Sequence, residues 1–156
     1  MEERKVLIII PTYNEKETIN ILIEQLKKKH PDFSILVVDD NSPDLTWKKV
    51  EELKKKFTDV YLIVRRNKMG LGTAYREGFG FARDRKFDIV IQMDADLSHS
   101  PGDIEGVLAL LGECDVVVGS RYKGGTRVKN WSIGRLLLSR CANIFASLMT
   151  GIPMRD

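Results

Sequence analysis

The sequence predicts an α/β fold: a mostly parallel central sheet with helices on both faces. Short runs rich in Val, Ile and Leu alternate with segments that carry apolar residues at helical spacing. The apolar runs lack the polar alternation of half-exposed strands, so both faces of the sheet are expected to be buried. The chain has 156 residues, 43% hydrophobic and 30% charged. One core can form at this length, and we expect a single domain over residues 1–156.

The elements follow one another along the chain in strict alternation. The first strand is expected over residues 5–11 and the second over 33–39, both nearly continuous apolar runs. Between them, residues 15–30 predict a helix whose apolar stripe consists of Ile19, Leu22, Ile23 and Leu26. The remaining pattern predicts strands at 60–64, 88–93 and 116–119, and helices at 45–57, 71–85 and 101–111.

A polar, glycine-containing loop and a long apolar helix at residues 132–150 end the chain. The broad apolar stripe of this helix is typical of core packing or of a partner helix, and Arg135 and Arg140 also allow contact with an anionic membrane surface. No stretch reaches the roughly 18 consecutive apolar residues of a membrane span, and the acidic N-terminus does not resemble a signal peptide. We therefore expect a cytoplasmic protein, peripheral at the cytoplasmic face of a membrane.

Basic residues are concentrated in the last third of the chain. Residues 116–156 contain seven Lys and Arg against one acid, whereas residues 1–115 contain 18 basic and 21 acidic residues. This asymmetry indicates an anionic partner near the C-terminal third, and a solvated basic face is the alternative. We expect no nucleic-acid partner.

Polar motifs follow the predicted strands, where ligands bind in open α/β sheets. The motifs are Thr12-Tyr13-Asn14-Glu15, Asp39-Asp40-Asn41-Ser42, Asp94-Ala95-Asp96 and Ser120-Arg121-Tyr122. Turn and helix-cap chemistry is a sufficient explanation for Asn41, Ser42 and Asp44. It does not explain two separate pairs of carboxylates.

Asp94 and Asp96 are spaced i and i+2 on an extended segment, so their side chains are expected on the same side. A divalent cation would relieve the repulsion between them, and hard oxygen ligands suit Mg²⁺ or Mn²⁺. Such an ion can bridge the oxygens of a departing diphosphate. His99 either orients a ligand or closes the loop.

Several other classes of site are disfavoured. The chain has no glycine-rich dinucleotide fingerprint after the first strand and no phosphate-binding P-loop. Gly70 and Gly72 either cradle an anion or form a turn with tight helix packing. A phospho-receiver domain requires an acid pair after its first strand, whereas the pairs here follow strands two and four.

Five ordered motifs, "IIPTYNE", "VVDDNSPDLT", "KMGLGTAY", "MDADLSHSP" and "VGSRYKGG", together resemble the inverting GT-A glycosyltransferases of family 2, in particular dolichol-phosphate (polyprenyl-phosphate) mannosyltransferases. The resemblance implies a GT-A, Rossmann-like α/β/α sandwich. It places residues at the base and ribose of a sugar nucleotide: Pro11, Tyr13, Glu15, Val38 and Asp40. It assigns sugar-nucleotide and metal contacts to Asp94, Ala95 and Asp96, a further metal-shell position to Ser98, and a place near the diphosphate to Arg121.

The chain departs from the family pattern at two places. Leu45 stands where the family usually has Gly, and the family continues beyond the acid at Asp156, at which this chain stops. The resemblance therefore implies a domain truncated at its C-terminus.

The acceptor is expected to be a phosphate. Residues 116–155 contain no Asp, Glu or His that could act as general base. A phosphate monoester needs none, because with a second pKa of about 6 it is already an anion at neutral pH. We expect a polyprenyl or dolichyl phosphate to be held by the basic side chains of Arg121, Lys123, Arg127, Lys129 and Arg135.

The expected function is transfer of a sugar, with mannose from GDP-mannose favoured, to polyprenyl phosphate with Mg²⁺ or Mn²⁺ as cofactor. Two alternatives remain open: a nucleotide-sugar-binding domain without turnover, and a family 2 relative that uses another donor such as UDP-glucose.

Overall fold

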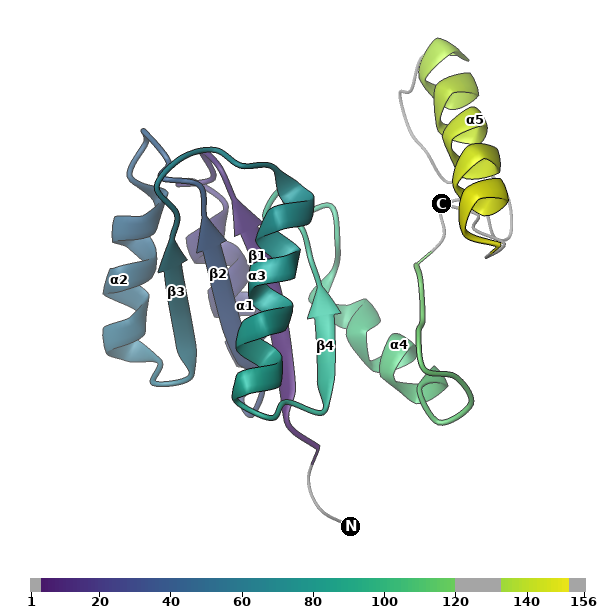
Figure 1. The fold of residues 1–156 in the computed structure, drawn as a ribbon. Coiled ribbons are helices and arrows are strands. Elements are labelled where there is room, and N and C mark those ends of the chain that lie inside the picture. The colour runs from purple at the N-terminus through teal and green to yellow at the C-terminus, as the bar shows by residue number, and fades with distance from the viewer. Residues whose placement is uncertain (1–3, 120–132, 152–156) are drawn as a thin grey trace. The chain divides into compact units, whose positions relative to one another are not determined.

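The structure, a computed structural model, describes residues 4–119 and 133–151 (Figure 1). The chain divides into two units, residues 1–103 and 104–156. The first unit contains the sheet.

The sheet consists of four parallel strands in the order β3-β2-β1-β4. They are β1 (Val6–Thr12), β2 (Ser34–Asp39), β3 (Val60–Val64) and β4 (Ile89–Gln92). The two central strands are built from the apolar runs of the sequence, and the side chains from Leu7 to Ile10 and from Ile35 to Val38 are fully buried. The parallel arrangement predicted from this pattern is therefore confirmed.

Helices cover both faces of this sheet. Helices α1 (Ile19–Lys29) and α2 (Thr46–Lys56) pack against each other, while α3 (Leu71–Asp84) crosses β1 and β2 on the near face in Figure 1. A core cluster beneath α3 joins Leu7, Ile9, Leu36, Val38, Ala74 and Ala82. Strand order reverses between β1 and β4, which is where α/β sheets form ligand crevices at the carboxyl ends of their strands.

The predicted helix at residues 101–111 forms in two parts. A 3₁₀ turn, η1 (Pro101–Asp103), precedes α4 (Ile104–Leu110), and the amide of Asp103 donates to the carbonyl of Ser100. Proline at the first position favours this tight opening turn, because its missing amide is not needed there.

The strand predicted at residues 116–119 is wrong. These residues form no strand, and the Val116 side chain is 75% exposed. An apolar run becomes a strand only when a neighbouring strand supplies hydrogen bonds, and the four-stranded sheet contains no ladder to this segment.

The predicted C-terminal helix is confirmed as α5 (Ile133–Thr150). Several of its apolar side chains are exposed, including Leu138, Phe145 and Leu148. Among the helices of the described part of the chain, none has the length and apolar character needed to cross a bilayer.

Candidate active site

The carboxyl ends of β1 and β2 are joined by a buried carboxylate, Asp39. Its Oδ2 accepts hydrogen bonds from the Thr12 and Ser42 hydroxyls, each at 2.7 Å, and its Oδ1 accepts one from the Ser42 amide at 2.8 Å. Asp39 is completely buried, and these three hydrogen bonds satisfy its carboxylate oxygens without a ligand. The first acid of this pair is therefore a structural residue.

The loops after β1 and β2 are held against each other by further hydrogen bonds. The amide of Asn14 donates to the Ser42 hydroxyl, and the amide of Glu15 donates to the Thr46 hydroxyl, both at 3.0 Å. The amide of Lys16 donates to Asp44 at 3.0 Å. This network fixes the backbone around Tyr13 and Glu15.

Asp44 lies two residues before the start of α2 and accepts hydrogen bonds from its first residue. Its Oδ1 accepts hydrogen bonds from the amide of Thr46 at 2.9 Å and from the Thr46 hydroxyl at 2.6 Å. Burial raises the pKa of Asp44, but hydrogen bonds from Thr46 and from the Lys16 amide outweigh that effect and hold the pKa below its usual value.

Asp40 is buried in an ion pair with Arg65, a residue that the sequence did not single out. The two residues are 7% and 6% exposed. Arg65 Nε and Nη2 both contact Asp40 Oδ1, and the amide of Met69 donates to Oδ2 at 3.3 Å. Strand register brings the pair together: β2 and β3 align Asp39 with Val64, so the next residues along the two strands are neighbours.

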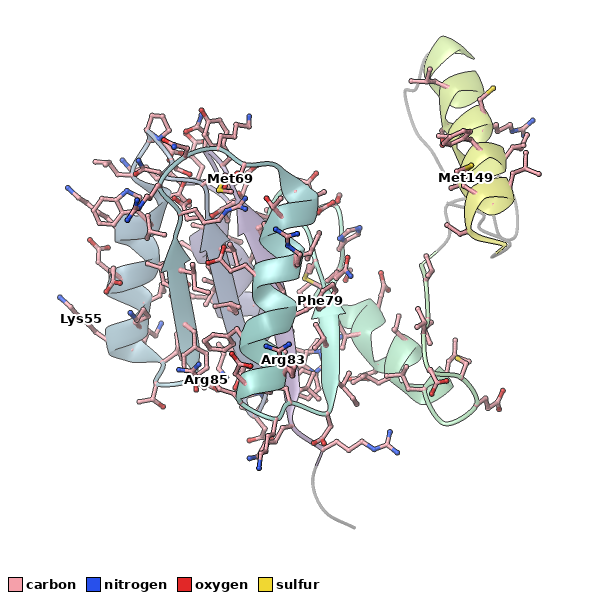
Figure 2. All side chains as sticks on the ribbon, viewed as in Figure 1. Lys55, Met69, Phe79, Arg83, Arg85 and Met149 are labelled. Carbon is pink, nitrogen blue, oxygen red and sulfur yellow. The ribbon has the colours of Figure 1, made fainter. Side chains whose placement is uncertain are left out.

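The segment after β3 also covers Tyr13. Lys68 Nζ lies 3.8 Å from the centre of the Tyr13 ring, a cation–π contact. On the side of α3, a hollow of about 270 Å³ is lined by Arg65, Met69, Thr73, Arg76 and Glu77. Figure 2 shows Met69 at the start of α3, with Arg83 and Arg85 at its other end.

The second acidic motif follows β4, next to β1. The amide of Met93 donates to the carbonyl of Ile9 at 3.1 Å, so the sheet positions the start of the motif. Ala95 is buried, while Asp96 is exposed and Asp94 is half-buried. Residues 95–97 form a bend, with Leu97 at φ +61°, so the motif is not the extended segment that the spacing predicted.

His99 closes this loop. Its Nδ1 accepts a hydrogen bond from the amide of Asp94 at 3.3 Å, and the amide of Ser98 donates to Asp96 Oδ1 at 2.9 Å. Hydrogen bonds from Ser98 hold the pKa of Asp96 below its usual value, and His99 adds to that effect. Asp96 is therefore ionised at neutral pH.

Tyr75 on α3 also contacts Asp94. Its hydroxyl donates to Asp94 Oδ1 at 3.5 Å. Burial, followed by the nearby Asp94 carboxylate, raises the pKa of Tyr75, so the hydroxyl stays protonated. Sequence reasoning assigned no role to Tyr75, although the residue belongs to the "KMGLGTAY" motif.

The oxygen-bearing side chains after β4 fit the ligand preference of a hard divalent cation. Asp94 and Asp96 supply two carboxylates on one short loop, and Ser98 supplies a hydroxyl next to them. No three His, Cys, Asp or Glu side chains converge within the residues that the structure describes. Two carboxylates with remaining positions for water and phosphate match Mg²⁺ or Mn²⁺ better than a metal held entirely by protein ligands.

The other predicted site residues fall into two groups. Pro11 and Val38 are register partners on β1 and β2, and the Val38 side chain is buried in the core beneath α3. Arg121, Lys123, Arg127 and Lys129 lie outside the described residues, as does the side chain of Arg135.

Gly70 forms the turn that leads into α3. Its φ of +87° is unfavourable for other residues, and its carbonyl accepts a hydrogen bond from Arg65 Nη2 at 3.0 Å. Gly72 has open space where a side chain would stand, so tight helix packing, one of the two alternatives for these glycines, is not found at this position.

The chain matches the model of Glycosyl transferase family 2 over residues 7–155. It is 39% identical over 155 residues to a polyprenol monophosphomannose synthase of Mycolicibacterium smegmatis, covering 98% of this chain and 58% of that protein. It is 36% identical over 152 residues to an undecaprenyl-phosphate mannosyltransferase of Micrococcus luteus, covering 97% and 63%. A dolichol-phosphate mannosyltransferase of Pyrococcus furiosus is 40% identical over 141 residues, covering 88% and 39%. The chain thus spans less than two thirds of each of these relatives.

Solved structures share the fold at lower identity. A mannosyltransferase from Pyrobaculum calidifontis, in complex with GDP-Man and Mn²⁺, superposes with a TM-score of 0.64 at 22% identity, covering 79% of this chain and 38% of that one. Glucosyl-3-phosphoglycerate synthase from Mycobacterium tuberculosis, in complex with UDP, also reaches 0.64, at 17% identity, covering 92% and 50%. These likenesses confirm the expected GT-A architecture. Because the family model matches nearly the whole of this chain, the chain belongs to glycosyl transferase family 2.

Proposed function

We propose that the protein is an inverting glycosyltransferase that moves mannose from GDP-mannose to a polyprenyl phosphate. The observation that carries this proposal is 39% identity, over 155 residues, to a polyprenol monophosphomannose synthase. Two further relatives at 36% and 40% identity are also named as mannosyltransferases for lipid phosphates. Their agreement favours mannose over glucose as the donor sugar.

The donor site is proposed at the carboxyl ends of β1, β2 and β4. Tyr13 and Glu15 stand on a backbone fixed by the Asn14–Ser42 and Glu15–Thr46 hydrogen bonds, and Asp40 is oriented by Arg65. These residues would bind the nucleoside.

The diphosphate would lie near the loop after β4. Asp94 and Asp96, with Ser98, would hold Mg²⁺ or Mn²⁺, and the ion would neutralise charge on the leaving diphosphate. His99 closes the loop, and Tyr75 orients Asp94, so the carboxylates are held in place before the donor arrives.

The acceptor phosphate is proposed to bind at the basic segment that contains Arg121, Lys123, Arg127 and Lys129, on the strength of its charge. An oxygen of the phosphate attacks the anomeric carbon, a C–O bond forms, and the nucleoside diphosphate leaves with the bonding electron pair. No side chain needs to remove a proton, because the acceptor is already an anion.

A lipid acceptor requires access to a membrane surface. We propose that the protein works peripherally at the cytoplasmic face, and that residues 1–156 belong to one GT-A domain. The match of the family model over residues 7–155 supports the second statement.

A transfer assay tests the proposed activity. The chain is incubated with labelled GDP-mannose, MnCl₂ and a short polyprenyl phosphate, and label in the lipid phase is counted, with UDP-glucose as the competing donor. Replacing Asp96 by Ala should lower transfer at least about 100-fold, because charge stabilisation of the leaving group is lost. Asp84→Ala, at an exposed acid on the far end of α3, is the matched control and should stay within about twofold of wild type.

Three outcomes separate the alternatives. Undiminished transfer by Asp96→Ala would refute the assignment of the acidic loop. Preferred use of UDP-glucose would identify another donor. Binding of GDP-mannose without transfer would support a nucleotide-sugar-binding domain.

A further inference from the structure

The Arg65 guanidinium joins the end of β2 to the start of α3. It contacts Asp40 Oδ1 after β2, donates from Nη1 to the Thr73 hydroxyl at 2.6 Å, and donates from Nη2 to the carbonyl of Gly70 at 3.0 Å. Arg65 itself stands directly after β3, where its amide donates to the carbonyl of Asp39 at 2.8 Å. One buried side chain thereby ties the ends of two strands to the start of α3.

Arg65 holds Asp40 without using all of its acceptor capacity. A carboxylate offers about four acceptor positions. Within the described residues, Nε and Nη2 of Arg65 approach Oδ1, and the Met69 amide approaches Oδ2. An acceptor position therefore remains on Oδ2, and its direction is set by the groups that hold the other three.

The same segment contacts a second residue of the proposed nucleoside site. Lys68, three residues after Arg65, lies over the Tyr13 ring, and Met69 contacts Asp40 through its amide. The hydrogen bonds of Arg65 to Gly70 and Thr73 fix the far end of this segment. Arg65 thus controls both the direction of the Asp40 carboxylate and the position of the chain that covers Tyr13.

We propose that Arg65 is a positioning residue for recognition of the donor's nucleobase, acting through Asp40. This role rests on the proposed function, because it requires a nucleoside diphosphate at the ends of β1 and β2. The buried ion pair keeps the carboxylate pointing toward a base N–H group before the donor arrives, which lowers the ordering cost of binding. Arg65 itself need not touch the donor.

Binding measurements can separate this role from a general structural one. GDP and inorganic diphosphate are each titrated into the 156-residue chain by calorimetry in the presence of MnCl₂. Arg65→Lys keeps the charge but cannot reproduce the planar fork of contacts. It should weaken the binding of GDP about 10- to 100-fold, by analogy with metal sites, where loss of a residue that orients a ligating side chain has an effect of this size. Diphosphate, which has no base, should bind as to wild type.

Arg66→Lys is the matched control. It makes the same substitution one residue later, at an exposed position, and should leave the affinity for GDP unchanged. Thermal unfolding of each variant establishes that it is folded. Wild-type affinity of folded Arg65→Lys for GDP, or an equal loss of GDP and diphosphate binding, would overturn the proposal.

A double-substitution cycle tests whether Arg65 acts through Asp40. Asp40→Asn combined with Arg65→Gln replaces the ion pair by a neutral pair, which avoids leaving a buried charge unpaired. In the Asp40→Asn background, Arg65→Gln should cause no further loss of GDP affinity. A further loss as large as that of Arg65→Gln alone would show that Arg65 works independently of Asp40. A wild-type chain that bound neither GDP nor UDP would remove the donor site itself, an outcome distinct from the two above.

Discussion

Two glycines on α3 allow the packing of this helix on the sheet to be tested by matched substitutions. A Cβ placed on Gly78 would lie 2.7 Å from both Cδ1 and Cγ2 of Ile9, whereas a Cβ on Gly80 meets no atom within 4 Å. Both positions are inside the same helix. Gly78→Ala and Gly80→Ala thus make the same chemical change and differ in the space available.

The expected magnitudes follow from two opposing effects. Alanine stabilises a helix interior by about 1 kcal/mol relative to glycine, and this gain applies to both variants. Ile9 is fully buried in a central strand, so it has little room to move, and overpacking of a core typically costs about 1–3 kcal/mol. Gly80→Ala should raise the free energy of unfolding by about 1 kcal/mol. Gly78→Ala should change it by between about 0 and −2 kcal/mol.

Urea and thermal unfolding measure the difference. For a chain of this size, 1 kcal/mol corresponds to about 2–4 °C in Tm, so the two variants should be separated by several degrees. Ile9→Val removes Cδ1 and should cost less in the Gly78→Ala background than in the wild type. If Gly78→Ala were as stable as Gly80→Ala, the close approach of α3 to β1 would be refuted.

Two further predictions concern the loop before α2. Leu45 has φ +66°, which costs a non-glycine residue about 1–2 kcal/mol, while glycine adds an entropic cost of about 0.5–1 kcal/mol. Leu45→Gly should therefore raise Tm by a few degrees, and Leu45→Ala should not. A fall in Tm with Leu45→Gly would show that contacts of the Leu45 side chain stabilise the fold by more than the strained backbone destabilises it. The pKa of Asp44 is lowered in the folded state, so its stabilising effect is complete above the unfolded value of about 4 and is lost as pH falls through the lower, folded value. Asp44→Asn should flatten the dependence of unfolding free energy on pH below about 4, measured by urea titration at several pH values, and an unchanged slope would contradict this account.

Local pattern was sufficient for most of the fold. The centres of β1 and β2, residues 6–10 and 35–38, are apolar without a break, which is typical of strands buried on both faces. The helical stripe of α1 buries Ile19, Leu22 and Ile23 as predicted. The same reasoning failed at residues 116–119. An isolated apolar run carries no information about whether a neighbouring strand is present to pair with it.

The acidic motifs show how far residue type alone can lead. Sequence reasoning grouped Asp39 and Asp40 as one acidic pair, but the two residues have different partners in the structure. Asp39 is enclosed by Thr12 and Ser42, and Asp40 pairs with Arg65. Neither role can be read from two adjacent letters, because Thr12 belongs to β1 and Arg65 directly follows β3.

The sequence by itself determined the order of strands and helices as far as α4, and the edge of the sheet where polar groups, Asp94 and Asp96 among them, collect. These follow from periodicity and from the fact that parallel strands end at a common edge. Only the tertiary structure decided that His99 closes the acidic loop, that Tyr75 reaches Asp94, and that Arg65 orients Asp40. Tyr75 and Asp94 are 19 positions apart in the sequence, and Arg65 and Asp40 are 25 apart. Strand register and helix packing bring such residues together, and local pattern does not reveal them.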